Sequence, residues 1–119
     1  MYKQNLGLLG EHKACQFLKN KGYKLLSQNF RSRVGEIDII CQDNDTIVFV
    51  EVKTRIGETF GRPEEAVTPW KIRSIIKTAN YFMMLNPKLP QLQRIDVISL
   101  ELSPAGEVKS LEHLVNVTG

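Results

Sequence analysis

The sequence predicts an α/β fold with a mixed central sheet of about five strands flanked by helices, in the order helix, three strands, helix, two strands. Two segments carry apolar residues at helical spacing, which predicts amphipathic helices. Shorter segments between them are rich in β-branched residues and are bounded by turn residues, which predicts strands. With 119 residues, the chain is expected to form a single domain over residues 1–119.

The first helix is expected from about Asn5 to Asn20, with Gly22 as its C-cap. Glu11 falls on the apolar stripe of this helix. A carboxylate on the buried side of a helix requires a partner or a function. The stripe includes Leu8, Ala14, Cys15 and Leu18.

Three strands follow the first helix, and turn residues separate them. They are expected at residues 23–30, 34–41 and 47–53, with a basic turn at 31–33 and a second turn at 43–45.

The second helix is expected to begin at Thr68-Pro69, because threonine is a good N-cap and proline suits the first helical position. A loop at 86–90 ends it, and strands follow at 94–100 and 111–117. The apolar stripe of this helix comprises Ile72, Ile75, Ile76, Ala79, Phe82 and Met83.

The hairpin between the second and third strands brings charged side chains together. If Asn44 and Asp45 form a two-residue loop, Asp38 lies directly opposite Glu51. Opposed side chains in an antiparallel pair have Cβ atoms roughly 5 Å apart. The same register places Glu36 opposite Lys53, on the face that Glu51 shares. A cross-strand salt bridge is the alternative interpretation of Glu36 and Lys53, but it leaves Asp38 facing Glu51 unexplained.

Two opposed carboxylates repel each other, which raises a pKa unless a cation neutralises them. Hard oxygen ligands suit Mg²⁺ or Mn²⁺, so Asp38 and Glu51 are candidate metal ligands. Lys53 could position or deprotonate a water, or offset the charge of a phosphate in the transition state. This set of catalytic candidates, Asp38, Glu51 and Lys53, is suited to metal-assisted hydrolysis of a phosphodiester.

At these residues the sequence resembles the PD-(D/E)XK nuclease superfamily, with EID at 36–38 and EVK at 51–53. The strings GEIDII and DTIVFVEVKTR are similar to the YraN-like family within it, which is related to archaeal Holliday-junction resolvases. The resemblance implies a restriction-endonuclease-like core, with Glu11 as the helix carboxylate that completes the metal site. Ile37 stands where the superfamily name has proline.

A nucleic-acid partner is compatible with a net charge of +3 and a pI of about 9.0. Solvated surface charges are nearly as good an interpretation of the individual basic residues, and Trp70 and Tyr81 are more typical of packing than of base stacking. The segment GETFGRPEEAV could order over a nucleic acid or simply connect its neighbours. The candidate phosphate contacts are Arg33, Arg55, Arg62, Lys71, Arg73 and Lys77.

The remaining polar and sulfur groups are expected to be structural. Cys15 and Cys41 form neither a CxxC pair nor a zinc spacing with a histidine, so they are interpreted as reduced core thiols. Asp96 is interpreted as a structural partner rather than a ligand. The sequence shows no membrane span and no signal peptide, which favours a cytoplasmic location.

The leading hypothesis is a metal-dependent DNA endonuclease. Structure-directed cleavage of branched or junction DNA is one form of this hypothesis. The alternative is a nucleic-acid-binding module with this fold and little or no catalysis, and a small-molecule phosphodiesterase is a third interpretation. The clustered carboxylates favour the enzyme, because a pure binder gains nothing from groups that repel phosphate. By analogy with junction-cutting relatives, a homodimer is also an open expectation.

Overall fold

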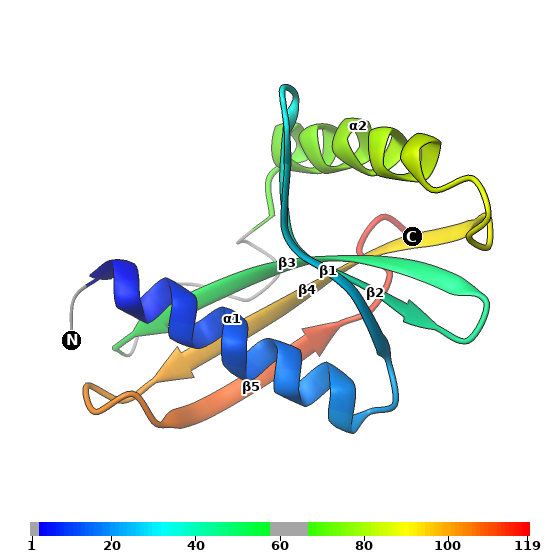
Figure 1. Cartoon of the computed structure of the whole chain (residues 1–119). Helices are drawn as coiled ribbons and strands as arrows, with labels where there is room; N and C mark the ends of the chain where they lie inside the picture. Colours follow the sequence, from blue (N-terminus) through cyan, green and yellow to red (C-terminus); the bar gives the residue numbers. More distant parts are fainter. Residues whose placement is uncertain (1–2, 58–66) are drawn as a thin grey trace.

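The computed structural model describes residues 3–57 and 67–119, and within them it has the predicted order of elements (Figure 1). Mixed α/β architecture is therefore confirmed. The elements are α1 (Lys3–Asn20), β1 (Lys24–Ser32), β2 (Gly35–Asp43), β3 (Thr46–Ile56), α2 (Pro69–Leu85), β4 (Leu92–Leu102) and β5 (Val108–Leu114).

The sheet follows the chain in the order β1-β2-β3-β4-β5. All neighbours are antiparallel except β3 and β4, which are parallel. Parallel neighbours need a crossover connection, and α2 lies in that connection. The two helices lie on opposite faces of the sheet (Figure 1).

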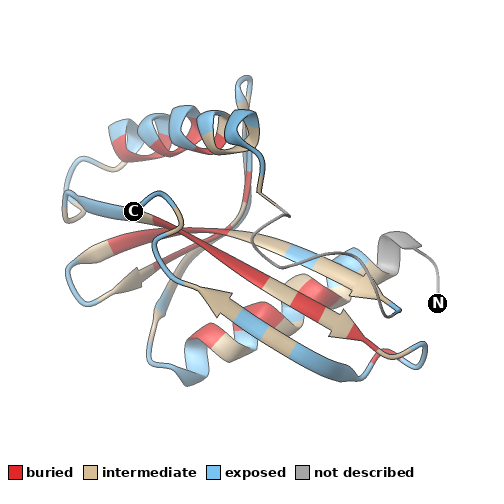
Figure 2. Ribbon diagram, turned by 180° about the vertical axis from the view of Figure 1, so that it is seen from behind, coloured by how far each residue is buried: buried red, intermediate tan, exposed pale blue. Residues whose placement is uncertain are grey.

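Each helix covers its own apolar core, and the buried residues line the central strands and the inner sides of both helices (Figure 2). Odd and even residues of β3 serve different cores, because side chains alternate along a strand. The core under α1 includes Ala14, Cys15, Leu18, Val48 and Val50. The core under α2 includes Phe49, Ile75, Ala79, Phe82 and Met83.

The β2–β3 hairpin has the predicted two-residue loop. Asp43 pairs with Thr46, and Asn44 has a positive φ of 55°. Asparagine tolerates this left-handed conformation better than most residues. The register runs on to Ile39 opposite Val50, which is the register that the turn predicted.

The start of α2 also agrees with the prediction. Thr68 is the N-cap, its side chain accepts from the Lys71 backbone N–H at 3.3 Å, and Pro69 opens the helix. This cap fixes where the first turn of α2 begins, and Lys71 lies in that turn.

Two of the predicted core residues are wrong. Leu8 is 62% exposed, and the buried hydrophobic side chains of α1 are Ala14, Cys15 and Leu18. Ile76 is 42% exposed. The β1–β2 hairpin covers the flank of α2 that carries Ser74 and Thr78, which leaves the flank with Ile76 open.

The strand predicted at residues 111–117 lies earlier, at Val108–Leu114. Beyond it the chain leaves regular pairing, since Asn116 has a positive φ of 57° and its N–H donates to the Asp96 side chain. The other strands extend beyond their predicted limits by a few residues. Within the described ranges, neither helix is long and apolar enough to cross a bilayer.

Candidate active site

The candidate site forms where β2 and β3 separate. Their ladder ends at Ile39 opposite Val50, and beyond it the β1–β2 hairpin turns away toward α2 (Figure 1). At this point the Val52 N–H donates to Asp38 Oδ2 at 2.8 Å. The Asp38 side chain thus takes the acceptor role of the departing strand, which fixes its carboxylate beside β3.

Glu51 completes a carboxyl pair with Asp38, and the two side chains hydrogen-bond to each other. Burial, followed by repulsion from Asp38, raises the pKa of Glu51 to about 7. Burial also raises the pKa of Asp38, although the hydrogen bond from Val52 opposes that shift. Near neutral pH, and with no cation between them, the two carboxyls therefore share a proton.

Glu11 lies beside this pair because α1 approaches β3 closely. A side-chain carbon at Gly10 would overlap the Thr54 side chain, so only glycine permits this approach. Burial and then the charge of Asp38 raise the pKa of Glu11, while a hydrogen bond with Asn29 opposes the rise. Glu11 thus lies close enough to Asp38 for the two charges to interact, and its role as a metal ligand stays a prediction.

A lysine on α2 balances part of this negative charge. Lys71 Nζ lies 3.4 Å from Glu51 Oε2, and the Glu51 side chain is only 12% exposed. Lys71 was predicted to contact phosphate, and the structure instead pairs it with Glu51. The N-cap at Thr68 signalled that Lys71 belongs to the first turn of α2, but the sequence did not show which strand that turn approaches.

Lys53 lies two residues after Glu51 on β3 and is exposed. The prediction that Glu36 lies opposite Lys53 is wrong, because β2 has already left β3 at that point. Glu36 instead pairs with Arg31 across the β1–β2 hairpin, with Arg31 Nε 3.3 Å from Glu36 Oε2.

The chemistry of the donor set fits a hard divalent cation. Asp38 and Glu51 supply carboxylate oxygens, which Mg²⁺ and Mn²⁺ prefer. The Lys71 ammonium already places one positive charge against the pair. In the part of the chain that the structure describes, no three His, Cys, Asp or Glu side chains come close enough to hold one ion as they stand.

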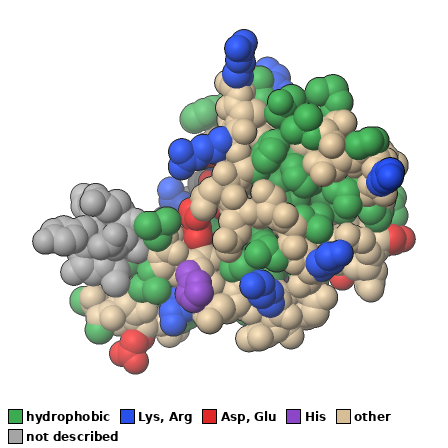
Figure 3. All heavy atoms as spheres, in the orientation of Figure 1, with side chains coloured by type: hydrophobic (Ala, Val, Ile, Leu, Met, Phe, Trp, Pro, Cys, Tyr) green, Lys and Arg blue, Asp and Glu red, His purple; other side chains and the backbone are tan. Residues whose placement is uncertain are grey.

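The other basic candidates are spread around the site. Acidic side chains lie recessed between basic ones near the base of the β1–β2 hairpin (Figure 3). Arg33 and Lys77 line a hollow beside α2, Arg73 is exposed on α2, and Arg55 follows Lys53 on β3. Arg62 and residues 58–66 of the predicted loop lie outside the described residues.

The exposed aromatic residues on α2 were misjudged. Trp70 is 65% exposed and Tyr81 is 40% exposed, so the packing interpretation is wrong for Trp70. Helical periodicity carried the signal for their exposure, because neither residue belongs to the apolar stripe of α2. Both are therefore available to an external partner.

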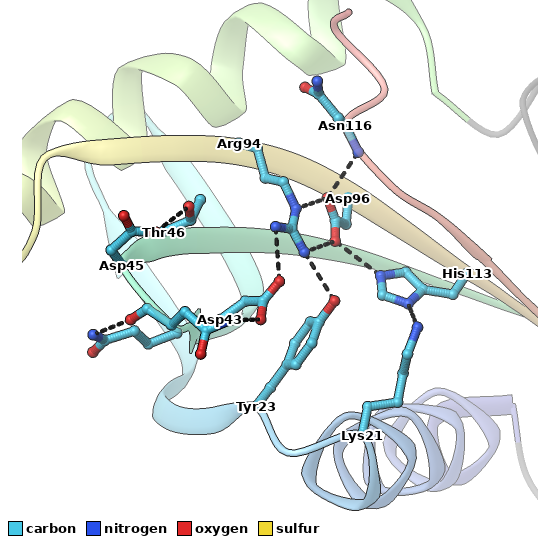
Figure 4. A network of polar contacts seen from close by, with 11 residues as sticks. Lys21, Tyr23, Asp43, Asp45, Thr46, Arg94, Asp96, His113 and Asn116 are labelled. Carbon is cyan, nitrogen blue, oxygen red and sulfur yellow. Dashed lines mark hydrogen bonds and ion pairs between the residues drawn. The ribbon is translucent and has the colours of Figure 1, made fainter.

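Asp96 belongs to a separate, closed network, as Figure 4 shows. Its carboxylate is fully buried and accepts from Arg94 Nε at 3.0 Å and from the Asn116 N–H at 2.9 Å. His113 Nε2 lies 2.8 Å from Asp96, and Lys21 Nζ lies 2.9 Å from His113 Nδ1. Since the lysine donates to Nδ1, the Nε2 proton points at Asp96.

This network confirms the structural interpretation of Asp96. Burial raises its pKa, but the hydrogen bonds from His113, Arg94 and Asn116 outweigh burial and leave the pKa lowered. Every buried side-chain nitrogen and oxygen among the described residues has a hydrogen-bond partner. The network accordingly has no vacant position for a ligand.

The two cysteines are buried and free, as predicted. Burial raises the pKa of the Cys41 thiol to about 12. Such a thiol stays protonated near neutral pH and is a poor nucleophile and metal ligand. Neither cysteine contributes to the candidate site.

Comparison with known proteins matches residues 10–100 to a family described as "Uncharacterised protein family UPF0102". A UPF0102 protein of Syntrophomonas wolfei is 46% identical over 113 residues, which cover 95% of this chain and 96% of that protein. A UPF0102 protein of Caldicellulosiruptor saccharolyticus is 42% identical over 116 residues, or 98% of each. A third, from Geobacter metallireducens, is 43% identical over 116 residues, covering 98% of this chain and 93% of its own.

Proposed function

We propose a function for this chain, which belongs to the uncharacterised protein family UPF0102, from the site that its residues build. UPF0102 is the YraN family, so the family resemblance of the sequence is confirmed. The proposed function is that of a Mg²⁺- or Mn²⁺-dependent DNA endonuclease of the PD-(D/E)XK type, which hydrolyses phosphodiester bonds. The observation that carries it is the partly buried Asp38–Glu51 pair with its raised pKa values, next to Lys53 and Lys71.

The metal would be held by Asp38 and Glu51, with Glu11 beside them. A divalent cation held there supplies Lewis-acid stabilisation of a phosphate oxygen and makes a bound water more acidic. Burial favours this role, because two carboxylates that repel each other in a dry site bind a cation more strongly than they would in water.

The protein's own groups position the reaction around this pair. The Val52 N–H holds Asp38 Oδ2, so the Asp38 carboxylate is oriented before any ligand arrives. Lys53 is exposed on the same face of β3 as Glu51, so its ammonium group places a positive charge beside the phosphate undergoing attack. Lys71 pairs with Glu51 in the free protein, and it would be free to contact phosphate if a metal took over that pairing.

A cleavage screen tests the proposal directly. Purified protein is incubated with branched, duplex and single-stranded DNA in Mg²⁺, Mn²⁺ or EDTA. Cleavage is expected in either metal and not in EDTA. Asp38→Asn should abolish it, while the control Asp45→Asn, at an exposed position in the β2–β3 turn, should cut like the parent. Binding to all three substrates without metal-dependent cleavage would instead support the binding-module hypothesis.

Salt dependence tests the polyanionic substrate separately from the chemistry. Phosphate contacts release counterions, so affinity for DNA in EDTA should fall steeply between about 50 and 200 mM salt. Arg73→Ala, at an exposed position on α2, should reduce the slope of log affinity against log salt by about one. An affinity that stays flat over this range would contradict a nucleic-acid substrate.

A further inference from the structure

A hollow outside the carboxylate site opens between the tip of the β1–β2 hairpin and α2. Its volume is about 540 Å³. Its lining residues come from the β1–β2 hairpin and from α2, two elements that Figure 1 shows side by side. The lining residues used below are Arg31, Arg33, Val34, Lys77, Asn80 and Tyr81.

We propose that this hollow binds one unpaired nucleotide of the nucleic acid that the site cuts. The proposal rests on the proposed function, and it narrows the substrate class to nucleic acids with an unpaired segment next to the scissile bond. Five features of the hollow support it: its charge, its exposed aromatic ring, its preformed walls, its size and its position.

The hollow is positively charged. Arg31, Arg33 and Lys77 bring three cationic groups to its walls. Glu36 pairs with Arg31 and offsets one of them, but the Arg31 side chain remains 76% exposed and keeps donors free for a phosphate. A phosphate group is the anion that such a spread of arginine and lysine recognises best.

The second feature is an aromatic ring that is anchored on one side and open on the other. The Tyr81 ring packs against Phe30, with ring centroids 6.2 Å apart, and Tyr81 is still 40% exposed. An exposed tyrosine inside a basic hollow provides a surface on which a base can stack. Asn80 adds an amide that can both donate to and accept from a base edge.

The walls are held together, so the hollow exists before a ligand binds. Ser74 Oγ on α2 donates to the Val34 carbonyl of the hairpin at 3.1 Å. Gly35 lies so close to Ser74 and Thr78 that a side-chain carbon there would overlap their hydroxyl groups. A preformed hollow loses little conformational entropy when it binds.

Size and position favour an unpaired nucleotide over a duplex. Pockets of roughly 300 to 1,000 Å³ enclose small ligands, and 540 Å³ suits a single nucleotide rather than a double helix. The hollow also lies close to the carboxylates. Glu36, the partner of Arg31, is two residues from Asp38, and Lys77 lies six residues, or about 9 Å, along α2 from Lys71.

The test measures binding in EDTA, where no cleavage can occur. Fluorescence anisotropy compares a labelled oligothymidylate with a duplex of the same length, using the parent, Tyr81→Ala, Tyr81→Phe and an Arg33→Ala/Lys77→Ala double variant. Lys24→Ala/Lys88→Ala, at two exposed positions that do not line the hollow, is the matched control for charge. Thermal melting of each variant verifies that it folds.

Loss of a stacking ring should weaken oligothymidylate binding by about tenfold or more in Tyr81→Ala and by less than about twofold in Tyr81→Phe, which keeps the ring. Duplex binding should stay within about twofold of the parent in both. Arg33→Ala/Lys77→Ala should weaken oligothymidylate binding more than the control Lys24→Ala/Lys88→Ala does. Unchanged oligothymidylate binding in Tyr81→Ala would overturn the proposal, and so would an equal loss for the duplex.

The result is independent of catalysis. If binding depends on Tyr81 but the protein cleaves no substrate, the nucleotide-site proposal stands and the endonuclease proposal is overturned. If cleavage requires Asp38 but not Tyr81, and Tyr81→Ala leaves single-strand binding unchanged, the endonuclease proposal stands and the nucleotide-site proposal is overturned.

Discussion

Glu51→Gln should stabilise the metal-free protein above pH 7, although it removes a residue of the candidate site. In the folded protein, burial and the charge of Asp38 raise the pKa of Glu51 from 4.5 to about 7. Ionisation of Glu51 therefore lowers the free energy of unfolding at alkaline pH. A glutamine keeps the shape and a hydrogen-bond donor toward Asp38 but cannot ionise, so this cost disappears.

The sign and size follow from linkage. Between pH 4.5 and about 7 the folded protein binds a proton at Glu51 that the unfolded chain has released, so stability falls as pH rises through this window. Because one pKa unit corresponds to about 1.4 kcal/mol, the full shift is worth on the order of 3 kcal/mol above pH 7. For a domain of this size, that difference moves the melting temperature by roughly 10 °C.

The assay is thermal unfolding of the parent and Glu51→Gln from pH 4 to pH 8 in EDTA, repeated in Mn²⁺. The two proteins should melt together near pH 4 and diverge as pH rises. Mn²⁺ should raise the melting temperature of the parent and have little effect on the variant, because a metal that binds only the folded state stabilises it. Glu112→Gln, at an exposed position on β5, is the control and should follow the parent throughout.

Two results would refute this reasoning. One is a Glu51→Gln protein that is less stable than the parent at pH 8 in EDTA, which would mean that ionised Glu51 stabilises the fold. The other is an equal Mn²⁺ stabilisation of both proteins, which would mean that Glu51 does not hold the metal.

Three further variants test other parts of the structure. Lys53→Met should lower the cleavage rate by about two to three orders of magnitude and leave DNA binding nearly normal, because the lost charge acts mainly in the transition state. Equal single-turnover cleavage rates in the parent and Lys53→Met would exclude that role. Asp96→Asn should cost about 3 to 5 kcal/mol in urea unfolding. The change removes the negative charge that Arg94 pairs with and replaces one acceptor oxygen by an NH2 group that faces other donors. A cost below about 1 kcal/mol would contradict the network. Gly10→Ala should destabilise the protein, because the added methyl group would overlap Thr54. Gly7→Ala, where no atom lies within 4 Å of the added carbon, should stabilise it by about 0.5 to 1 kcal/mol. If Gly10→Ala melted at a higher temperature than Gly7→Ala, the close approach of α1 to β3 would be contradicted.

The parts of the site that local chemistry determines could be predicted from the sequence. The two-residue loop at Asn44 sets the register of β2 and β3, and alternation along the strands then places Asp38 near Glu51. The N-cap at Thr68 likewise sets where α2 begins. These features depend on residues close together in the chain, so spacing rules suffice.

The remaining features depend on where the elements pack, and spacing rules do not describe that. The same register predicted Glu36 opposite Lys53, but β2 curves away from β3 once Asp38 replaces the backbone acceptor for Val52. The pairing of Lys71 with Glu51 requires the approach of α2 to β3. A sequence pattern identifies the face of a helix that is apolar, but not the residues that its edge will meet.

The two buried acidic clusters show why one is a candidate site and the other is structural. Asp96 receives donors from Arg94, His113 and the Asn116 backbone, and its pKa is lowered, so the network stabilises the charged form. Among the described residues, Asp38 and Glu51 contact one backbone donor, one lysine and each other, and both pKa values are raised.

A fold gains nothing from burying two carboxylates with so few partners, because desolvation disfavours the charge that each would carry. Such an uncompensated cost is typical of residues that are retained for binding or catalysis. A divalent metal ion, as the proposed function requires, would supply a compact positive charge that accepts oxygen ligands. The same imbalance that makes Glu51→Gln stabilising in EDTA is therefore the reason to expect that metal binding, and the cleavage that depends on it, will be lost in that variant.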